Sequence, residues 1–321
     1  MAARDAAGRN HRGDRALAAL RGWLDTAAVA DADDAGVDDD RIDWLRALPF
    51  IGMHLACLAV FAVGVSATAL WVALALYALR MFAITGFYHR YFSHRTFRAS
   101  RPVQFAFALL GAASVQRGPL WWAAHHRHHH VHADTARDPH TPRKGFWRSH
   151  VGWFLTRGGF RTDTSRIGDL LKFQELRWLD RWDTAVPVAL AVALYVAGEA
   201  LARWAPSLGT NGPQLLVWGF FVSTVALFHA TVTINSLAHR WGRRRFQTRD
   251  DSRNNLWLAL LTFGEGWHNN HHHFPGSARQ GFRWWEIDIT WYGLRALQAL
   301  RIVHDLKPVP AAVLARARGG R

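Results

Sequence analysis

An almost unbroken apolar stretch from residue 47 to residue 88 constrains the fold of this chain more than any other feature. Each helical residue advances 1.5 Å, so the stretch would extend over about 63 Å, roughly twice the ~30 Å thickness of a hydrocarbon core. The sequence therefore predicts two membrane crossings here. We expect them near 47–66 and 67–88, with a tight turn around Ser66–Thr68.

A second pair of apolar stretches predicts two further crossings, near 184–203 and 214–237. Pro187 is expected to break the first of them, because proline lacks an N–H and interrupts helix interiors. A shorter run, 102–115, is too brief to span and predicts a buried or interfacial helix. Together these stretches predict an all-α integral membrane protein with four transmembrane helices.

The distribution of charge predicts the orientation of these helices. Residues 90–183 contain sixteen Lys and Arg against seven Asp and Glu, and residues 240–321 contain fourteen against six. An excess of basic residues is typical of cytosolic loops. We therefore expect a multi-pass protein with both termini and a helical cap, residues 89–183 and 238–305, on the cytosolic side. In a bacterium the membrane would be the cell (inner) membrane.

Residues 1–40 are rich in Asp, Arg and Ala without an apolar core, which predicts a flexible N-terminal tail rather than a secretory signal. We expect the membrane domain at 41–305 and a C-terminal tail at 306–321.

The single cysteine, Cys57, excludes a disulfide framework. The net charge of +15 would suit nucleic acid or a membrane surface. Because the basic residues adjoin apolar runs and no nucleic-acid motif is present, we expect the lipid bilayer as partner and no nucleic acid.

Three histidine clusters, at 89–94, 125–134 and 268–273, carry the chemical information. Neutral imidazole is a common ligand of iron, zinc, copper and nickel. On a helix, histidines three and four residues apart fall within one 100° arc, whereas adjacent ones diverge by 100°, so one cluster could serve two neighbouring metals. The candidate ligands are His89, His94, His126, His129, His130, His239, His268, His271 and His272.

Two spacings leave the arrangement open. His89 and His94, five residues apart, would diverge by 140° on a regular helix, so they could share a metal only if the helix ends there; otherwise each serves a different metal. Asn235 and His239, four apart, lie along one face at the end of the last expected crossing. Nine imidazoles exceed the six positions of an octahedral ion, which favours two metals. Imidazole-rich coordination with open positions suits redox iron that must meet O₂.

The clusters and their flanks resemble the three histidine boxes of the membrane fatty acyl desaturases, specifically the stearoyl-CoA (acyl-CoA Δ9) branch. The resemblance covers about residues 47–275. It extends beyond the boxes to six motifs: Arg80–His89, Gln116–Trp122, Asp138–His140, Ser149–Trp153, Asn235–His239 and Gly264–His268.

This resemblance implies that the nine candidate histidines ligate two iron ions and that Asn235 contributes through water. Four further histidines stay outside the implied ligand set: His125, His128, His132 and His273. Asp134 and Asp138 are close enough in sequence to accept hydrogen bonds from ligand imidazoles, a frequent arrangement around metal-bound histidine. Glu265 fits either that role or a structural one.

The resemblance also implies a narrow, bent tunnel for an extended acyl chain. The positions around its bend and wall are matched by Gln116, Trp122, Thr231 and Trp153. Arg143 and Lys144 match a basic pair that meets the phosphates of CoA. A contact with anionic membrane lipid is the alternative for this pair.

The expected reaction is O₂-dependent formation of a cis double bond, at Δ9, in a saturated acyl-CoA, with two external electrons and two waters formed. An acyl chain on carrier protein or phospholipid is the alternative donor. Only 46 residues follow Pro275 and no His-Pro-Gly-Gly haem motif is present. We therefore expect a separate electron donor: ferredoxin, rubredoxin or cytochrome b5 with its reductase.

Two rival functions remain open at this point. A hydroxylase or ketolase of the same histidine-box superfamily would insert oxygen into the lipid instead. A histidine-rich membrane metal transporter is the alternative from another class, but its ligands would be expected inside several spans. A purely structural membrane protein would leave nine regularly spaced histidines unexplained.

Overall fold

The structure is a computed structural model and describes residues 21–26 and 40–319. Within these ranges, four apolar helices are long enough to cross a membrane: Trp44–Val63, Ala67–Ser93, Ala185–Trp204 and Gly212–Ser236. The predicted four-span, all-α architecture is confirmed. The first span begins three residues earlier than expected and ends before Gly64, whose φ of +67° is a conformation that glycine adopts readily.

Most spans are built from more than one helical segment, and shorter elements form the cap. The spans comprise α3 (Trp44–Ala56), η1 (Cys57–Ala59) and α4 (Val60–Val63); α5 (Ala67–Phe82) and η2 (Ala83–Ser93); α11 (Ala185–Trp204); and α12 (Gly212–Gln214), η7 (Leu215–Val222) and α13 (Ser223–Ser236). The other elements are β1 (Arg98–Ala99), α6 (Arg101–Ala112), α7 (Pro119–His132), η3 (Pro142–Lys144), η4 (Arg148–Gly152), α8 (Arg157–Phe160), η5 (Thr164–Arg166), α9 (Gly168–Leu171), α10 (Gln174–Arg181), η6 (Pro206–Leu208), α14 (Leu256–Leu261), α15 (His268–His273), α16 (Ile289–Ala299), β2 (Val303–His304) and α17 (Ala311–Gly319).

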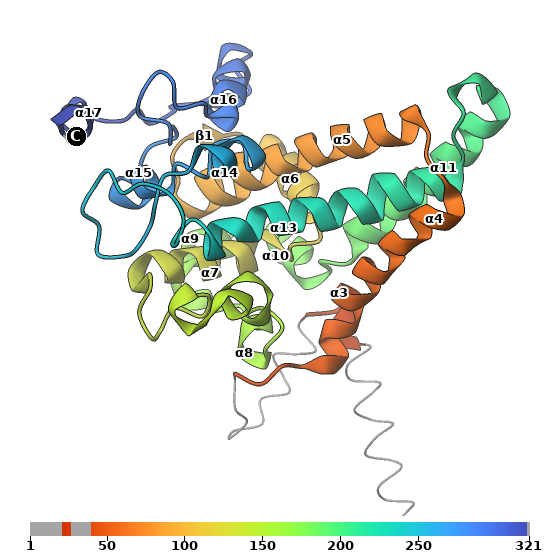
Figure 1. Cartoon of the computed structure of the whole chain (residues 1–321), viewed down its shortest axis with the longest axis horizontal. Helices are drawn as coiled ribbons and strands as arrows, with labels where there is room; N and C mark the ends of the chain where they lie inside the picture. Colours follow the sequence, from red (N-terminus) through yellow and green to blue (C-terminus); the bar gives the residue numbers. More distant parts are fainter. Residues whose placement is uncertain (1–20, 27–39, 320–321) are drawn as a thin grey trace, which may run out of the picture.

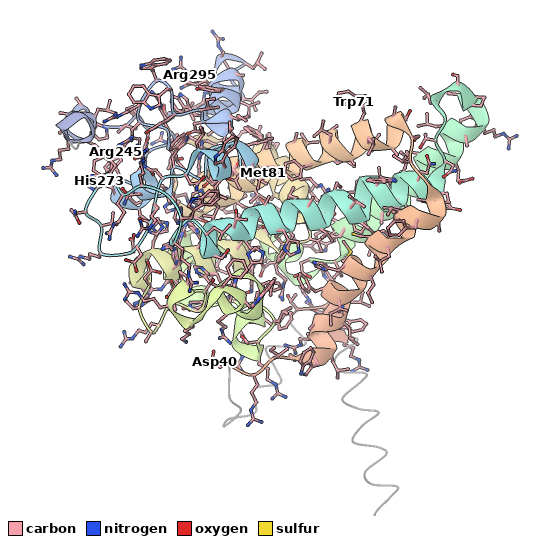
Figure 2. All side chains as sticks on the ribbon, viewed as in Figure 1. Asp40, Trp71, Met81, Arg245, His273 and Arg295 are labelled. Atoms are coloured by element: carbon pink, nitrogen blue, oxygen red, sulfur yellow. The ribbon has the colours of Figure 1, made fainter. Side chains whose placement is uncertain are left out.

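Figure 1 shows the cap elements gathered at one end of the spans. The helices α5 and α13 pack against each other, and both η2 and α13 carry the chain into the cap, where α7 packs against η2. The short antiparallel ribbon pairs Arg98 with His304. In Figure 2, Arg245, His273 and Arg295 lie at the cap end, whereas Trp71 projects from the outer face of α5. The arrangement places polar chemistry in the cap and apolar surface along the spans.

The structure corrects the prediction for α11 and confirms the one for α6. Pro187 does not break its span, because it lies in the first turn of α11, where the missing N–H has no intrahelical partner to lose. The run 102–115 forms α6, whose Gln104, Ala108 and Gly111 are buried, as predicted for a non-spanning helix. An added Cβ at Gly111 would lie 2.1 Å from the ring of Tyr88, so glycine is required for this close approach to η2.

The expected tails are only partly covered by the structure. Residues 1–20 and 27–39 of the predicted N-terminal tail lie outside the described residues. The segment 21–26 contacts the cap: Thr26 N donates to the carbonyl of Arg181 at 2.9 Å. At the other end, the predicted tail contains α17, whose Val313 and Leu314 pack against Phe246 and Phe282. A backbone hydrogen bond thus ties the first segment to the cap, and apolar contacts tie the second.

Candidate metal centre

Nine histidines of the cap converge in two adjoining groups. Within the described residues, one ligand nitrogen from each member of a group lies within 4.8 Å of the others. The first group, called here the five-histidine group, contains His89, His94, His126, His130 and His271. The second, called the four-histidine group, contains His129, His239, His268 and His272. These are the nine histidines that the sequence predicted, and the structure divides them between two sites.

The winding of η2 brings His89 and His94 into the same group. The backbone N–H of His94 donates to the carbonyl of His89, five residues earlier, at 3.2 Å. Such i→i+5 winding is wider than an α-helical turn; it is rare in proteins and occurs frequently at functional sites. It removes the 140° divergence expected on a regular helix, and the two ring centroids lie 4.9 Å apart. The alternative in which each histidine serves a different metal is therefore not the one observed.

Two short helices each contribute to both groups. On α7, His126 and His130 point to the five-histidine group, while His129 points to the four-histidine group. On α15 the assignment is the opposite. His268 and His272, four residues apart, join the four-histidine group, and His271 joins the five-histidine group. This division follows from the 100° between neighbouring residues of a helix, as the sequence predicted. His239, just after α13, completes the four-histidine group.

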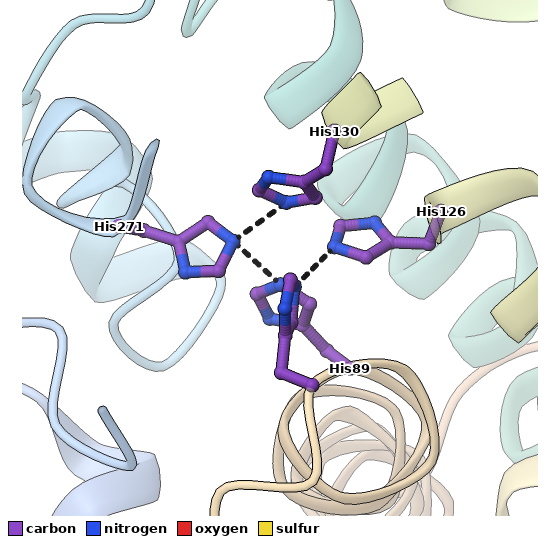
Figure 3. A group of neighbouring side chains, drawn as sticks. His89, His126, His130 and His271 are labelled. Atoms are coloured by element: carbon purple, nitrogen blue, oxygen red, sulfur yellow. Dashed lines mark hydrogen bonds between the residues drawn. The ribbon is translucent and has the colours of Figure 1, made fainter. Parts of the chain in front are cut away.

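The Nε2 atoms of each group face one another at short range. In the five-histidine group, Nε2 of His271 lies 3.1 Å from Nε2 of His89 and 2.9 Å from that of His130. Figure 3 shows these rings pointing towards a common centre. In the four-histidine group, the Nε2 atoms of His239 and His268 lie 2.9 Å apart. A cation between the rings would satisfy these converging nitrogen lone pairs.

Carboxylates hold the opposite ring nitrogen of several ligands. Nδ1 of His129 donates to Asp138 at 3.0 Å, and Nδ1 of His239 donates to Asp134 at 2.8 Å. Because a carboxylate can only accept, each bond fixes the proton on Nδ1 and leaves Nε2 with a free lone pair. Glu265 likewise accepts from Nδ1 of His89, at 2.5 Å.

Glu265 also has a structural role, so both functions considered from the sequence apply. Its Oε1 accepts from the buried Arg90 at 3.1 Å, and Gln280 donates at 3.1 Å to the Oε2 that His89 contacts. Arg90 is paired in addition with Asp288 at 3.0 Å. This network joins η2 to the segment after α15.

The electrostatics of the cap keep most ligand imidazoles neutral. Burial, followed by neighbouring imidazoles, lowers the pKa of five of them well below the ordinary value: His94, His126, His130, His268 and His271. His129 differs: burial lowers its pKa, but the carboxylates of Asp138, Asp134 and Asp250 together outweigh burial and raise it. Burial opposes ionisation of Asp138, but His140 and His129 hold the pKa of that carboxyl below its usual range. Neutral rings beside anionic carboxylates are the donor set that metal ligation requires.

The donor set therefore fits transition metals that favour imidazole. Both groups present converging imidazole nitrogens, and carboxylates hold the far side of His89, His129 and His239. The four remaining histidines of the clusters belong to neither group. His125 and His128 contact backbone carbonyls at 3.0 Å and 2.9 Å, and His273 stacks on Phe246.

An apolar cavity of about 560 Å³ adjoins the five-histidine group. Four residues that the sequence assigned to a tunnel line it: Gln116, Trp122, Trp153 and Thr231. The amide of Gln116 donates to the hydroxyl of Thr231 at 3.1 Å, which links the segment before α7 to α13. Trp122 stacks on His126 with centroids 5.0 Å apart, so the cavity wall touches a candidate ligand. Asn235 also lines this cavity.

The predicted basic pair lies elsewhere. Arg143 is exposed and bonded to Asp251 at 2.9 Å, and Lys144 lies 3.9 Å from Asp40. Neither residue lines the cavity. The structure thus brings together every sequence-predicted site residue except this pair.

Sequence reasoning missed two contributors to the centre. Asp250 accepts from Nδ1 of His272 at 2.9 Å, in the same way as the carboxylates that were predicted. His140 lies between the centre and the cavity, and its Nδ1 is 3.1 Å from Asp138. Asp250 sits in a loop far from any histidine cluster in sequence, so no spacing marked it. His140 belonged to a recognised motif but was given no role.

The four apolar spans and the two histidine groups define an integral membrane protein with a metal-binding cap. Comparison with known proteins identifies the family. The model of the family described as "Fatty acid desaturase" matches residues 66–305, most of the chain. The chain belongs to this fatty acid desaturase family, which makes it an oxidoreductase.

Characterised relatives differ in the acyl donor that their names specify. The acyl-CoA 5-desaturase AL21 of Anemone leveillei is 40% identical over 82% of this chain and 78% of its own length. The sn-1 stearoyl-lipid 9-desaturase of Anabaena variabilis is 35% identical over 83% of this chain and 94% of its own length. The Delta-9 acyl-lipid desaturase 1 of Arabidopsis thaliana is 37% identical over 83% and 84%, respectively.

Proposed function

We propose that this protein is an O₂-dependent desaturase that forms a cis double bond, at Δ9, in a saturated acyl chain. The two histidine groups would each hold one iron ion, with Asn235 contributing through water. The observation that carries the proposal is the position of the five-histidine group beside one apolar cavity, whose wall includes Trp122 and His126. A long hydrocarbon chain fits a cavity of this lining.

Bound iron would supply, with O₂, the oxidising power that acid–base groups lack, because methylene C–H bonds are not acidic. The overall change balances: a saturated chain, one O₂, two electrons and two protons give the alkene and two waters. Every other requirement falls on the protein itself. It must hold one pair of carbons near the centre and keep the remaining methylenes away from it.

The residues around the cavity are suited to that positioning. The bond between Gln116 and Thr231 fixes a polar contact across the cavity wall, and Trp122 presents a flat face beside His126. The carboxylates of Asp134, Asp138 and Glu265 hold the ligand rings in one orientation. A chain that bends at this point would present a single carbon pair to the metals.

Electrons would come from a separate protein. The cap side carries the basic excess, and the positive-inside rule supports a cytosolic orientation for the cap and both termini. Complementary charge would attract an acidic donor such as ferredoxin, rubredoxin or cytochrome b5. Arg143 and Lys144, exposed on the cap, remain proposed contacts for anionic groups of the acyl donor.

The test is expression in a host that lacks its own desaturase, followed by mass analysis and double-bond mapping of its lipids. We expect products lighter by two hydrogens with a double bond at carbon 9. The variant His129→Ala in the same host is the matched control and should give none. A product that has gained oxygen would identify a hydroxylase or ketolase instead, and metal uptake without any lipid change would identify a transporter.

A further inference from the structure

The cavity beside the histidine groups continues into the membrane-spanning part of the protein. Its lining includes Pro49 and Gly52 from α3, Val188 and Val192 from α11, and Phe221 from η7. It therefore runs between three spans and is not confined to the cap.

One side of this cavity is open. Val188 and Val192 line it, yet 57% and 58% of their surface is exposed. On the facing helix, Pro49 and Gly52 are exposed as well, and a Cβ added to Gly52 would meet no atom within 4 Å. A closed wall would bury its lining residues.

Other residues that line the cavity are buried, as expected of a closed wall. Near the histidine groups, Gln116, Trp121 and Trp153 are each at most 8% exposed, and on the far side Phe220 and Thr224 are at most 5% exposed. The exposed lining residues lie on the rim formed by α3 and α11, apart from Val115, which precedes α7 and is 37% exposed. We call this rim the lateral opening.

The depth of the lateral opening places it against lipid tails. Val188 and Val192 are the fourth and eighth residues of α11, about 5 Å and about 11 Å along the helix from its cap end. Pro49 and Gly52 occupy the matching part of the span that begins at Trp44. A leaflet is about 15 Å of a ~30 Å hydrocarbon core. The opening therefore faces the acyl chains of the leaflet next to the cap.

We propose that the lateral opening between α3 and α11 admits the acyl chain of a membrane glycerolipid sideways from the bilayer, so that the substrate is a lipid-linked chain. This inference rests on the desaturase function proposed above. The rim is formed by valine, proline and glycine, which accept hydrocarbon. Arg46, which lines the cavity about one turn nearer the cap, is paired with Asp43. A glycerolipid already places its chain at this depth, whereas a chain on CoA must first leave water.

The test uses photo-crosslinking, which needs no turnover. The full-length, iron-loaded protein is placed in phosphatidylglycerol vesicles whose stearoyl chain carries a diazirine, and in parallel is given a diazirine-labelled stearoyl-CoA in plain vesicles. Crosslinks from the lipid probe are expected on peptides of α13, which lies across the cavity. Val192→Trp should reduce them roughly tenfold, because a close-packed indole leaves no room for a chain.

Two further variants keep the test decisive. Gly52→Trp closes the opposite rim and should give the same loss, so that a folding defect in one variant does not decide the outcome. Val196→Trp lies on α11 with 59% exposure but outside the cavity lining, and should crosslink as the wild type does. Equal crosslinking by all three variants would overturn the lateral entrance.

Desaturation of the two unlabelled donors, measured separately, distinguishes the two proposals. Product from stearoyl-lipid but not stearoyl-CoA supports the entrance. Product from stearoyl-CoA alone, with lipid crosslinks absent from α13, overturns the entrance and leaves the desaturase function standing. Lipid crosslinks on α13 without product from either donor support the entrance and contradict the desaturase function.

Discussion

The two histidine groups contain the same ligand chemistry but are held in place differently. In the four-histidine group, carboxylates accept from Nδ1 of three members, His129, His239 and His272. In the five-histidine group, among the described residues, a carboxylate contacts only His89 in this way. The wide turn of η2 and the two short helices α7 and α15 orient the others. Ring orientation thus depends on acidic partners in one group and on backbone geometry in the other.

The largest expected effect comes from removing one ligand of each group. His271→Ala and His129→Ala should both abolish the unsaturated product while the protein still inserts into membranes, because each group would lose a ligand that no neighbour replaces. Lipid analysis in a desaturase-free host and membrane fractionation measure the two outcomes. His273→Ala, outside both groups, is the matched control and should retain activity. Full activity in either ligand variant would contradict the two-site arrangement.

Removing the single carboxylate of the five-histidine group should have the next largest effect. Glu265→Gln replaces the anionic acceptor of His89 by a neutral amide and leaves the buried Arg90 with Asp288 as its one carboxylate partner. Breaking a buried ion pair costs about 3–5 kcal/mol, so the denaturation midpoint in detergent should fall together with metal content. A variant with wild-type stability would show that this network does not support η2.

A smaller loss is expected from one carboxylate of the four-histidine group. Asp250→Ala removes the acceptor of Nδ1 of His272 but leaves Asp134 and Asp138 in place. Loss of such a partner lowers metal affinity by roughly 10–100-fold. Titration with a chelator should therefore remove about one metal more easily and leave the other unchanged. Simultaneous loss of both metals would mean that the groups are not independent.

The smallest effect is expected from Asp180, on the pH dependence of stability. Because Asp180 supports α7, which carries members of both groups, the change should affect the two groups equally. Its carboxylate accepts from the backbone N–H of Trp121 in the first turn of α7, the helix that serves both groups. Burial raises the pKa of Asp180 to about 6, with Asp183 adding to the rise while the N–H of Trp121 and Arg117 oppose it. A pKa raised in the folded state means that stability present below the ordinary value is lost as pH rises through about 6.

The measurement is the thermal midpoint in detergent between about pH 5 and about pH 7.5. The midpoint of the wild type should fall over this range, and that of Asp180→Asn should fall less, because the amide keeps the bond to Trp121 without an ionisable group. Identical pH profiles would show that Asp180 does not titrate in this range.

The parts of the protein that the sequence predicted are those whose chemistry demands particular residue types. A hydrocarbon core requires long apolar runs, which gave the four spans to within a few residues, and imidazole ligation requires histidine, which marked all nine members of the two groups. The assignment of His94 could not be predicted, because it depends on the wide turn of η2 and periodicity assumes a regular helix. Asp250 approaches its histidine only through tertiary folding.

The cavity illustrates a second limit. Gln116 and Thr231 were matched through a family resemblance, but the lateral opening is formed by Val188, Val192 and Gly52, which look like any membrane-facing residues in sequence. Only their placement on two facing helices distinguishes them. The substrate contact of Arg143 stays a prediction: the side chain is exposed on the cap and paired with Asp251.

The central claim is that each histidine group holds one iron ion, and metal analysis of the purified protein tests it most directly. Protein purified from cells grown with iron should contain about two iron ions per chain, since nine imidazoles exceed what one ion accepts. A reproducible content of one ion per chain, or zinc in place of iron, would contradict the account.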